Sequence, residues 1–338
     1  MRKLPKRPTR SATLFVTALA SAGVATSAAS AFELRLPVAC ELGSECFIQQ
    51  YPDTDPTSGA QDPFCGNATY DTHDGTDIRI RSLPDMERGV AVVAAADGEV
   101  LRMRDGEPDR LVVTDEDRER VADRECGNGL IIAHEGGYET QYCHLKQDSI
   151  SVKPGDRVKA GQKIGEIGAS GMAQFPHVHL TVRKDGKVVD PASGRAPAEG
   201  CEADRSRLAP LFAKDVTDRL TPELPDILGF GLAGEPIEHD ELVVEGPPPV
   251  AKSADTITLA WGWFINLRKD DRLRLTIRQP DGTELVDHTT EPVDRSKAVY
   301  SAFAGKKRKP QQGRHEVGVA VIRKGAAIVE KTQFIEVE

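Results

Sequence analysis

The apolar and polar residues between positions 70 and 192 form short apolar runs rather than long periodic stretches. Glycine-containing turns separate these runs at residues 97–98, 135–137 and 185–186. Turns of this kind between apolar runs are typical of β-hairpins. No stretch repeats apolar residues every 3.6 positions, as an amphipathic helix would. The pattern predicts an all-β, antiparallel domain with a hairpin at each turn, interrupted by a polar, highly charged insertion at about 102–128.

A second β pattern follows a run of three prolines at 247–249. Apolar and polar residues alternate in 273–278, as in a strand with one buried face. We expect residues 250–338 to form a small Ig-like β-sandwich and residues 201–249, with the stiff proline run, to connect it to the first domain. Trp261 and Trp263 are expected in the core of this sandwich rather than on a sugar-binding platform.

The N-terminal residues 1–31 have a different composition. Basic residues at the start are followed by a small-residue apolar stretch and the sequence Ala29-Ser30-Ala31. This order is typical of a secretory signal peptide, here cut before Phe32. An uncleaved membrane anchor is the weaker alternative, because a span requires about 20 apolar residues. We expect a protein exported across the inner membrane, periplasmic or extracellular, with no membrane span in the mature chain.

Charge and cysteine content narrow the class further. Five of the 44 basic residues precede Phe32, which leaves 39 basic against 53 acidic residues and a net charge of −14 in the mature chain. A nucleic-acid binder would carry a basic face, so this class is not expected. All six cysteines follow the cleavage point and are expected to form three disulfides in an oxidising compartment, since no C-x-x-C pair suggests a zinc knuckle. Residues 32–69 are expected to be a disulfide-stapled segment.

Three short patterns contain residues that could hold or serve a metal ion. The sequence HDGTD places His73 four positions before Asp77, with a glycine between them. His177 and His179 alternate in a predicted strand and can share a face, and His144 ends a hairpin strand. A catalytic zinc ion takes three nitrogen or oxygen ligands and keeps one open position. His73, Asp77 and one histidine of the His177/His179 pair supply such a set, which leaves the other histidines for proton transfer.

The order and spacing of these patterns resemble the lysostaphin/LytM-type zinc metallo-endopeptidase domain. The matching segments are 73–77, 94–100, 132–134, 142–145, 152–165, 176–180 and 190–191. The resemblance covers about a third of the chain, in the family's order, and implies a peptidase domain at 70–200 with one Zn²⁺ on the floor of a β-sheet groove. The chain departs from the family's pattern in the loop 169–175 and at Leu180-Thr181, which affects the groove rather than the site.

The resemblance also assigns the roles that spacing left open. It implies His73, Asp77 and His179 as the zinc ligands and His144 and His177 as the catalytic pair. Asp74, which follows the first of these ligands, is expected to be a turn residue.

The function expected on these grounds is zinc-dependent hydrolysis of peptide bonds in peptidoglycan stem or cross-link peptides. The alternative is a LytM-type regulator without hydrolytic activity that activates other cell-wall hydrolases. Such regulators usually lack one or more ligands, whereas this chain keeps every ligand position. For the C-terminal sandwich we expect a role in positioning the enzyme on the wall or on a protein partner.

Overall fold

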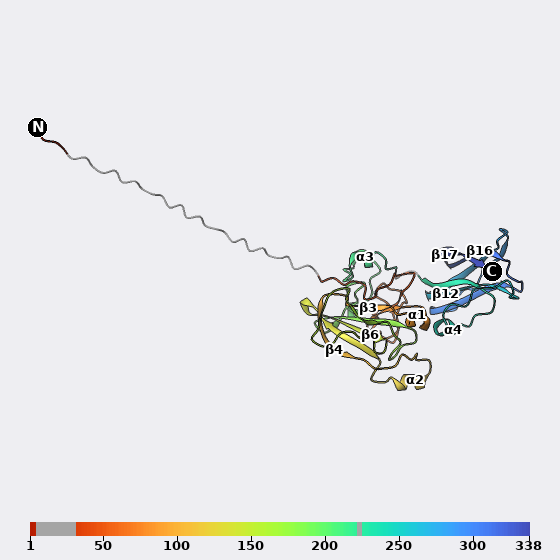
Figure 1. Ribbon diagram of the computed structural model, residues 1–338, viewed down its shortest axis with the longest axis horizontal. Coiled ribbons are helices and arrows are strands. Elements are labelled where there is room, and N and C mark those ends of the chain that lie inside the picture. The colour runs from red at the N-terminus through yellow and green to blue at the C-terminus, as the bar shows by residue number, and fades with distance from the viewer. Residues whose placement is uncertain (5–31, 222–224) are drawn as a thin grey trace. The chain divides into compact units, whose positions relative to one another are not determined.

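The computed structural model describes residues 1–4, 32–221 and 225–338 (Figure 1). The predicted signal-peptide features between residues 5 and 31 lie outside the described residues. The chain divides into two units, Met1–Ala31 and Phe32–Glu338, and every element named below belongs to the second. Within the described ranges, no helix combines the length and apolar character needed to cross a membrane.

An eight-stranded sheet is the main element of the first β region. Its spatial order is β1 (Phe47–Gln50), β2 (Thr76–Arg79), β9 (His177–Lys184), β6 (Tyr138–Leu145), β5 (Asn128–Ala133), β4 (Gly98–Arg104) and β7 (Arg157–Val158), with β10 (Lys187–Val188) paired to β9. Every neighbouring pair is antiparallel. The predicted antiparallel fold is therefore confirmed, as are the hairpins β5–β6 and β9–β10.

The hairpin predicted at residues 97–98 is wrong. β3 (Ala91–Val93) pairs with β8 (Lys163–Glu166) in a separate two-stranded sheet, whereas β4 joins the large sheet. The turn at 97–98 does not pair β3 with β4. It contacts the turn at 159–162 instead, where Lys159 and the Ala160 backbone N–H donate hydrogen bonds to the Asp97 carboxylate. Gly98 is required for close packing against β5, since a Cβ there would lie 2.4 Å from the Ala133 carbonyl oxygen.

Alternation along β9 separates the core face of the large sheet from its opposite face. Val178, Leu180 and Val182 are fully buried in the main hydrophobic core. His177 and His179 alternate with them and therefore lie on the other face. The same alternation on β2 places Ile78 in the core. The core residues thus fix which side chains reach the opposite face.

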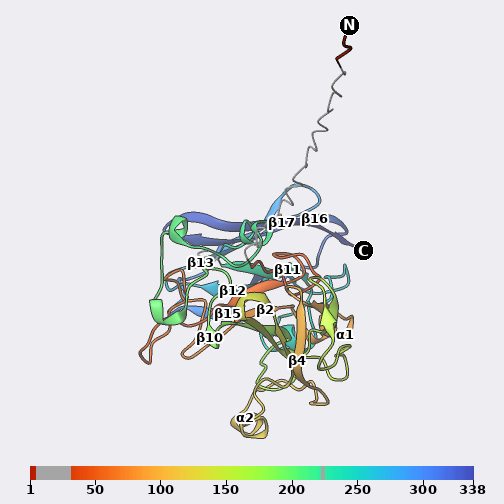
Figure 2. The same ribbon diagram turned by 90° about the vertical axis from the view of Figure 1, so that its left-hand side faces the viewer.

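Short helices lie in the connections between strands. They are α1 (Leu83–Glu87), α2 (Asp115–Arg120), α3 (Lys214–Thr217) and α4 (Glu241–Val244), with single 3₁₀ turns at Glu135–Gly137, Pro197–Glu199 and Arg205–Arg207. Helix α2 belongs to the predicted insertion and begins with a capping box between Thr114 and Asp117. It extends away from the sheet in both views (Figures 1 and 2).

The C-terminal β region consists of two sheets that share one core. The first sheet contains β11 (Asp226–Ala233), β12 (Thr258–Leu267) and β15 (Lys297–Lys306); the second contains β14 (Glu284–Thr289), β13 (Arg272–Arg278), β16 (Gly313–Arg323) and β17 (Ala326–Val337). β11 lies within the segment that was expected to be a connection. Trp261 and Trp263 on β12 are both buried and form no exposed platform, but they lie in a cluster with Phe47 on the outer face of the sheet and not in the sandwich core, where they were expected.

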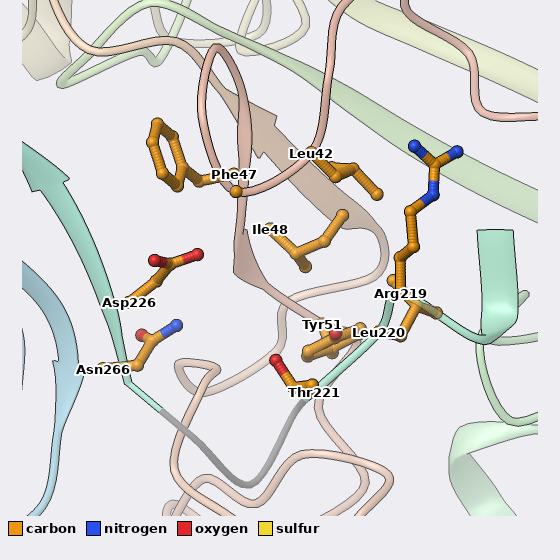
Figure 3. A pocket seen from close by; sticks show the side chains of 10 residues that line it. Leu42, Phe47, Ile48, Tyr51, Arg219, Leu220, Thr221, Asp226 and Asn266 are labelled. Carbon is orange, nitrogen blue, oxygen red and sulfur yellow. The ribbon is translucent and has the colours of Figure 1, made fainter. Parts of the chain in front are cut away.

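The three-stranded sheet also packs on the N-terminal segment, residues 32–69. Its outer face forms a core cluster with Phe47 of β1. Gln49 Nε2 donates to the Ala298 carbonyl oxygen at 2.8 Å, and Asn266 Nδ2 donates to the Gln49 carbonyl oxygen at 3.0 Å. Residues of this segment line a pocket together with Asp226 and Asn266, as Figure 3 shows. The volume of this pocket is about 150 Å³. The N-terminal segment therefore contacts both β regions.

All six cysteines are paired, as predicted. The disulfides are Cys40–Cys46, Cys65–Cys201 and Cys126–Cys143. The second bond joins the N-terminal segment to the chain that follows the large sheet.

Candidate metal centre

Strands β2 and β9 bring three predicted ligands to one point. Asp77 lies directly opposite His179 in the register of the two strands, and His73 lies just before β2. His73 Nε2 is 3.2 Å from Asp77 Oδ1 and 3.1 Å from His179 Nδ1, and His179 Nδ1 is 2.9 Å from Asp77 Oδ1. Within the described residues these three side chains form one group that could hold a metal ion.

The outward nitrogen of each ligand histidine contacts an acceptor. His73 Nδ1 lies 2.7 Å from the Tyr51 carbonyl oxygen, which can only accept, so Nδ1 carries a proton. His179 Nε2 lies 3.1 Å from Asp74 Oδ1 and donates to that carboxylate. A metal ion bound here would leave both rings neutral, each with an unprotonated nitrogen directed inward. The inward atoms would then be two nitrogen lone pairs and a carboxylate oxygen.

The carboxylates of Asp77 and Asp74 favour a positive charge at this point. Burial would raise the pKa of Asp77, but the neighbouring histidines outweigh it and hold the pKa well below its usual value. Burial lowers the pKa of His179, yet its contacts with Asp74 and Asp77 raise the pKa to about 9. Ligands about 2.0 Å from a tetrahedral ion lie about 3.3 Å apart, close to the distances in this cluster. The donor set fits a divalent metal ion with two nitrogen ligands and one oxygen ligand.

Gly75 has no side chain, and the ring of His179 lies in the space that a side chain would fill. A Cβ at this position would lie 2.4 Å from His179 Nε2 and 2.8 Å from the Leu180 carbonyl oxygen. Strand β9 therefore approaches the turn so closely that no side chain fits between them. This contact explains the glycine inside the HDGTD sequence.

His144 and His177 lie together beside the cluster. Their ring centroids are 4.5 Å apart, and His177 Nε2 is 3.7 Å from Asp77 Oδ1. The Nδ1 atoms donate to the carbonyl oxygens of Ser170 and Phe175, each at 2.8 Å. Burial lowers the pKa of both rings, most strongly that of His144. Both rings are therefore neutral at neutral pH, with Nε2 free to accept a proton.

The structure places further residues at this site that the sequence did not predict. Asp74 contacts His179 and is more than a turn residue. Arg183 lies 3.5 Å from the Asp74 carboxylate and donates to Gln141 Oε1 at 2.8 Å. The Tyr70 ring lies 4.5 Å from the His73 ring. Only Arg183 had a local signal, since it follows His179 by four positions on the same strand and so shares its face.

Comparison with known proteins agrees with the resemblance found in the sequence. Residues 71–191 match the model of Peptidase family M23. This stretch holds the three clustered ligands and the adjacent histidine pair, and it is an M23 peptidase domain of the LytM type.

Two curated relatives and one solved structure are similar to parts of the chain. The peptidoglycan DD-endopeptidase ShyB of Vibrio cholerae serotype O1 is 44% identical over 71 residues, which is 21% of this chain and 16% of ShyB. The DD-carboxypeptidase/endopeptidase Mpg of Neisseria meningitidis serogroup B is 37% identical over 84 residues, 25% of this chain and 19% of Mpg. The crystal structure of a zinc-containing peptidase from Vibrio cholerae is 30% identical, with 44% of this chain and 39% of that one covered and a TM-score of 0.27. The matches span less than a fifth of either curated relative.

Proposed function

We propose that this chain is a zinc-dependent endopeptidase that hydrolyses peptide bonds in the stem or cross-link peptides of peptidoglycan. One observation supports this most: the inward atoms of His73, Asp77 and His179 converge within 3.2 Å of one another beside two neutral histidines. The M23 family match and the peptidoglycan DD-endopeptidase name of one relative favour the same reaction and substrate class.

In this proposal His73, Asp77 and His179 hold one Zn²⁺. When bound, this ion supplies a Lewis acid that polarises a peptide carbonyl and activates water. His144 and His177 manage the protons: an unprotonated Nε2 accepts a proton as the C–O bond forms. The resulting imidazolium returns a proton to the amine nitrogen as the C–N bond breaks. The carbonyl oxygens on Nδ1 keep each ring in the tautomer that this exchange requires.

The proposal includes the place where the enzyme acts. Export through the N-terminal signal would release a mature chain that begins at Phe32, outside the cytoplasmic membrane. The three disulfides fit an oxidising compartment.

The test combines metal content with turnover of dimeric muropeptides purified from peptidoglycan. The wild-type protein should bind one zinc ion and release monomeric products identifiable by mass. His73→Ala should lose both metal and activity, whereas His144→Ala and His177→Ala should keep the metal and lose about 10²- to 10⁴-fold in turnover. A zinc-loaded wild-type protein without turnover would instead support the regulator. Full activity with stoichiometric metal in His73→Ala would disprove the ligand set.

A further inference from the structure

Arg79 is a fully buried arginine on β2, two residues after Asp77. No carboxylate in the described part of the chain pairs with its guanidinium. The group donates instead to the carbonyl oxygens of Ile80 and Arg81 and to Gln49 Oε1 at 2.9 Å. Burial lowers the pKa of Arg79 to about 9, which leaves it charged at neutral pH. Burying a guanidinium without a carboxylate is unfavourable, so the groups that surround it need an explanation.

Two aromatic rings from different regions of the chain contact this guanidinium. The Arg79 Cζ atom lies 4.4 Å from the centroid of the Phe175 ring and 5.2 Å from that of the Trp263 ring. Phe175 belongs to the loop that enters β9, and Trp263 belongs to β12 of the C-terminal region. Gln49, which accepts from Arg79, also donates to the Ala298 carbonyl oxygen on β15. The C-terminal sheet therefore holds the guanidinium by one direct and one indirect contact.

Phe175 also connects the Arg79 guanidinium to His177. Arg79 lies directly opposite His177 in the register of β2 and β9. The Phe175 ring lies 4.6 Å from the His177 ring, and the Phe175 carbonyl oxygen accepts the hydrogen bond from His177 Nδ1. The residue that stacks on the guanidinium is thus also the residue that sets the tautomer of His177.

We propose that Trp263 and Arg79 are positioning residues for His177. The ring of Trp263 holds the Arg79 guanidinium, the guanidinium holds Phe175, and Phe175 fixes the orientation and tautomer of His177. The C-terminal β region then supports the active site and is not solely a module that places the enzyme on the wall. This inference rests on the proposed function, because His177 is a proposed catalytic residue.

The surroundings of Trp263 indicate which part of this side chain matters. Its Nε1 is buried and has no hydrogen-bond partner in the described part of the chain. An unpaired buried donor is unfavourable, so the indole is retained for its ring rather than for its N–H group. Phenylalanine keeps an aromatic face and removes the unpaired donor. Trp263→Phe should therefore preserve the support, whereas Trp263→Leu should remove it.

Trp261 provides a matched control for these variants. It is buried on the same strand, two positions from Trp263, and belongs to the same core cluster. Its indole packs beside Gly229 and Gly231 of β11 and makes no cation–π contact with Arg79. Trp261→Leu should weaken the C-terminal sheet as much as Trp263→Leu does, but it should leave His177 in place.

The test uses the full mature chain in zinc-loaded form and dimeric muropeptides as substrate. We expect Trp263→Leu to lower kcat by about tenfold to a hundredfold, as small misplacements of a catalytic group do, with KM and zinc stoichiometry unchanged. Phe175→Leu, at a partly exposed position, should give the same loss. Trp263→Phe and Trp261→Leu should keep kcat within about twofold of the wild-type value.

A second measurement does not depend on turnover. The proton on His177 Nδ1 should give a slowly exchanging low-field NMR signal in ¹⁵N-histidine-labelled protein, since the Phe175 carbonyl oxygen protects it. This signal should disappear in Trp263→Leu and remain in Trp261→Leu and Trp263→Phe. Wild-type kcat together with an intact signal in folded Trp263→Leu would overturn the inference, as would an equal loss in Trp261→Leu. If the zinc-loaded wild type does not hydrolyse muropeptides, the proposed function fails, while the NMR signal still decides whether Trp263 positions His177.

Discussion

At the scale of single residues, the site depends on what holds the outward nitrogen of each histidine. Backbone carbonyl oxygens accept from the outward nitrogens of His73, His144 and His177. Substitution cannot remove a carbonyl, so a side-chain change can affect these three supports only by shifting the backbone, as proposed above for Phe175 at His177. His179 differs, because the partners of its Nε2 are side chains: the Asp74 carboxylate at 3.1 Å, which is about half exposed, and the Thr181 hydroxyl at 3.0 Å. Asp74 is therefore the support that a single substitution can test.

Asp74→Ala should weaken zinc binding and leave the fold intact. The substitution removes the carboxylate that fixes the ring of His179 and makes its inward nitrogen more basic. Loss of such an outer contact typically lowers metal affinity about 10- to 100-fold. Competition with a chelator measures the change. Asp71→Ala is the matched control, because Asp71 is exposed and its side chain makes no contact that involves the cluster. Equal affinities for the two variants would show that Asp74 is only a turn residue.

A second residue-scale prediction concerns Asp190, which is fully buried. Burial raises the pKa of Asp190 to about 6, against hydrogen bonds from Ser193 and Ala192 that lower it. In the unfolded chain an aspartate has a pKa of about 3.9. The folded state therefore binds this proton more tightly than the unfolded state does. The stabilisation from the proton is complete below pH 3.9, falls as the pH rises towards 6, and is absent above that.

The difference in stability between Asp190→Asn and the wild type isolates this contribution. The wild type should lose stability between pH 4 and pH 7 as Asp190 ionises, whereas asparagine cannot ionise. The free energy of unfolding of the variant, minus that of the wild type, should therefore increase over this range. The gain is on the order of 3 kcal/mol, because one pKa unit corresponds to about 1.4 kcal/mol. Urea unfolding of the metal-free proteins measures it. A difference between Asp190→Asn and the wild type that stays constant from pH 4 to pH 7 would contradict the raised pKa.

At the scale of elements, the end of β6 has an irregular backbone. His144 has φ of 62°, in the left-handed region that non-glycine residues seldom adopt. The neighbouring residue Cys143 forms a disulfide with Cys126, and the Cys126 carbonyl oxygen accepts from the His144 N–H at 2.8 Å. The disulfide therefore holds Cys126 beside His144, where the Cys126 carbonyl oxygen supports the left-handed conformation of His144.

Removal of the Cys126–Cys143 disulfide should lower muropeptide turnover, while zinc binding should change less. The double variant Cys126→Ala/Cys143→Ala should lose about 3 kcal/mol of stability, as expected for a cross-link across a loop of this length. Its zinc stoichiometry should stay the same, since both sulfur atoms accept from Gln141 Nε2, and the backbone of Cys143, which lies opposite His179 in the register of β6 and β9, is unchanged by the substitution. Muropeptide turnover and chelator competition separate the two effects. Cys40→Ala/Cys46→Ala removes a shorter cross-link in the N-terminal segment and should leave turnover unchanged. Equal losses of turnover would contradict a specific effect on His144.

The strands show what a short stretch of sequence can predict: which face a residue occupies, but not the register with a distant strand. Alternation in β9 placed His177 and His179 on one face, as the strand has them. The choice between them depended on the family resemblance, because it is set by the register with β2, where Asp77 faces His179. Register with a distant strand is not encoded in a short pattern. The wrong hairpin at 97–98 has the same cause, since β3 and β4 both take partners from elsewhere in the chain.

Residues that act through tertiary contacts had no signal in the sequence. Arg79 follows the HDGTD motif closely, but its role depends on Phe175 and Trp263, which are far away in the chain. Strand β12 is apolar at nearly every position, because one face packs in the sandwich core and the other packs against Phe47. A strand buried on both faces does not alternate, so the pattern that identified residues 273–278 as a strand could not identify this one in full.

At the scale of the whole molecule, the N-terminal segment joins the two β regions. Strand β1 is the edge strand of the large sheet, and its residue Phe47 is buried among side chains of β11 and β12. The hydrogen bonds of Gln49 to Ala298 and Asn266 add polar contacts at the same place. Folding of the large sheet therefore stabilises the C-terminal region through this strand, and the two regions should unfold together.

Phe47→Ala should uncouple the two regions. Truncation of a buried phenylalanine costs about 3–5 kcal/mol, and this cost falls on the contact between the regions rather than on either core. Two probes follow them separately during heating. The only two tryptophans of the chain, Trp261 and Trp263, both lie on β12, so their fluorescence reports the C-terminal region. Release of zinc reports the peptidase domain.

In the wild type, tryptophan fluorescence and zinc release should change at one temperature. In Phe47→Ala, the fluorescence transition should shift to a lower temperature than zinc release, because the C-terminal region loses a partner while the metal cluster keeps all its contacts. Phe303→Ala is the control, since Phe303 on β15 is largely exposed and contributes little to either core. Coincident transitions at the wild-type temperature in Phe47→Ala would mean that Phe47 does not couple the regions and that the polar contacts of Gln49 are sufficient.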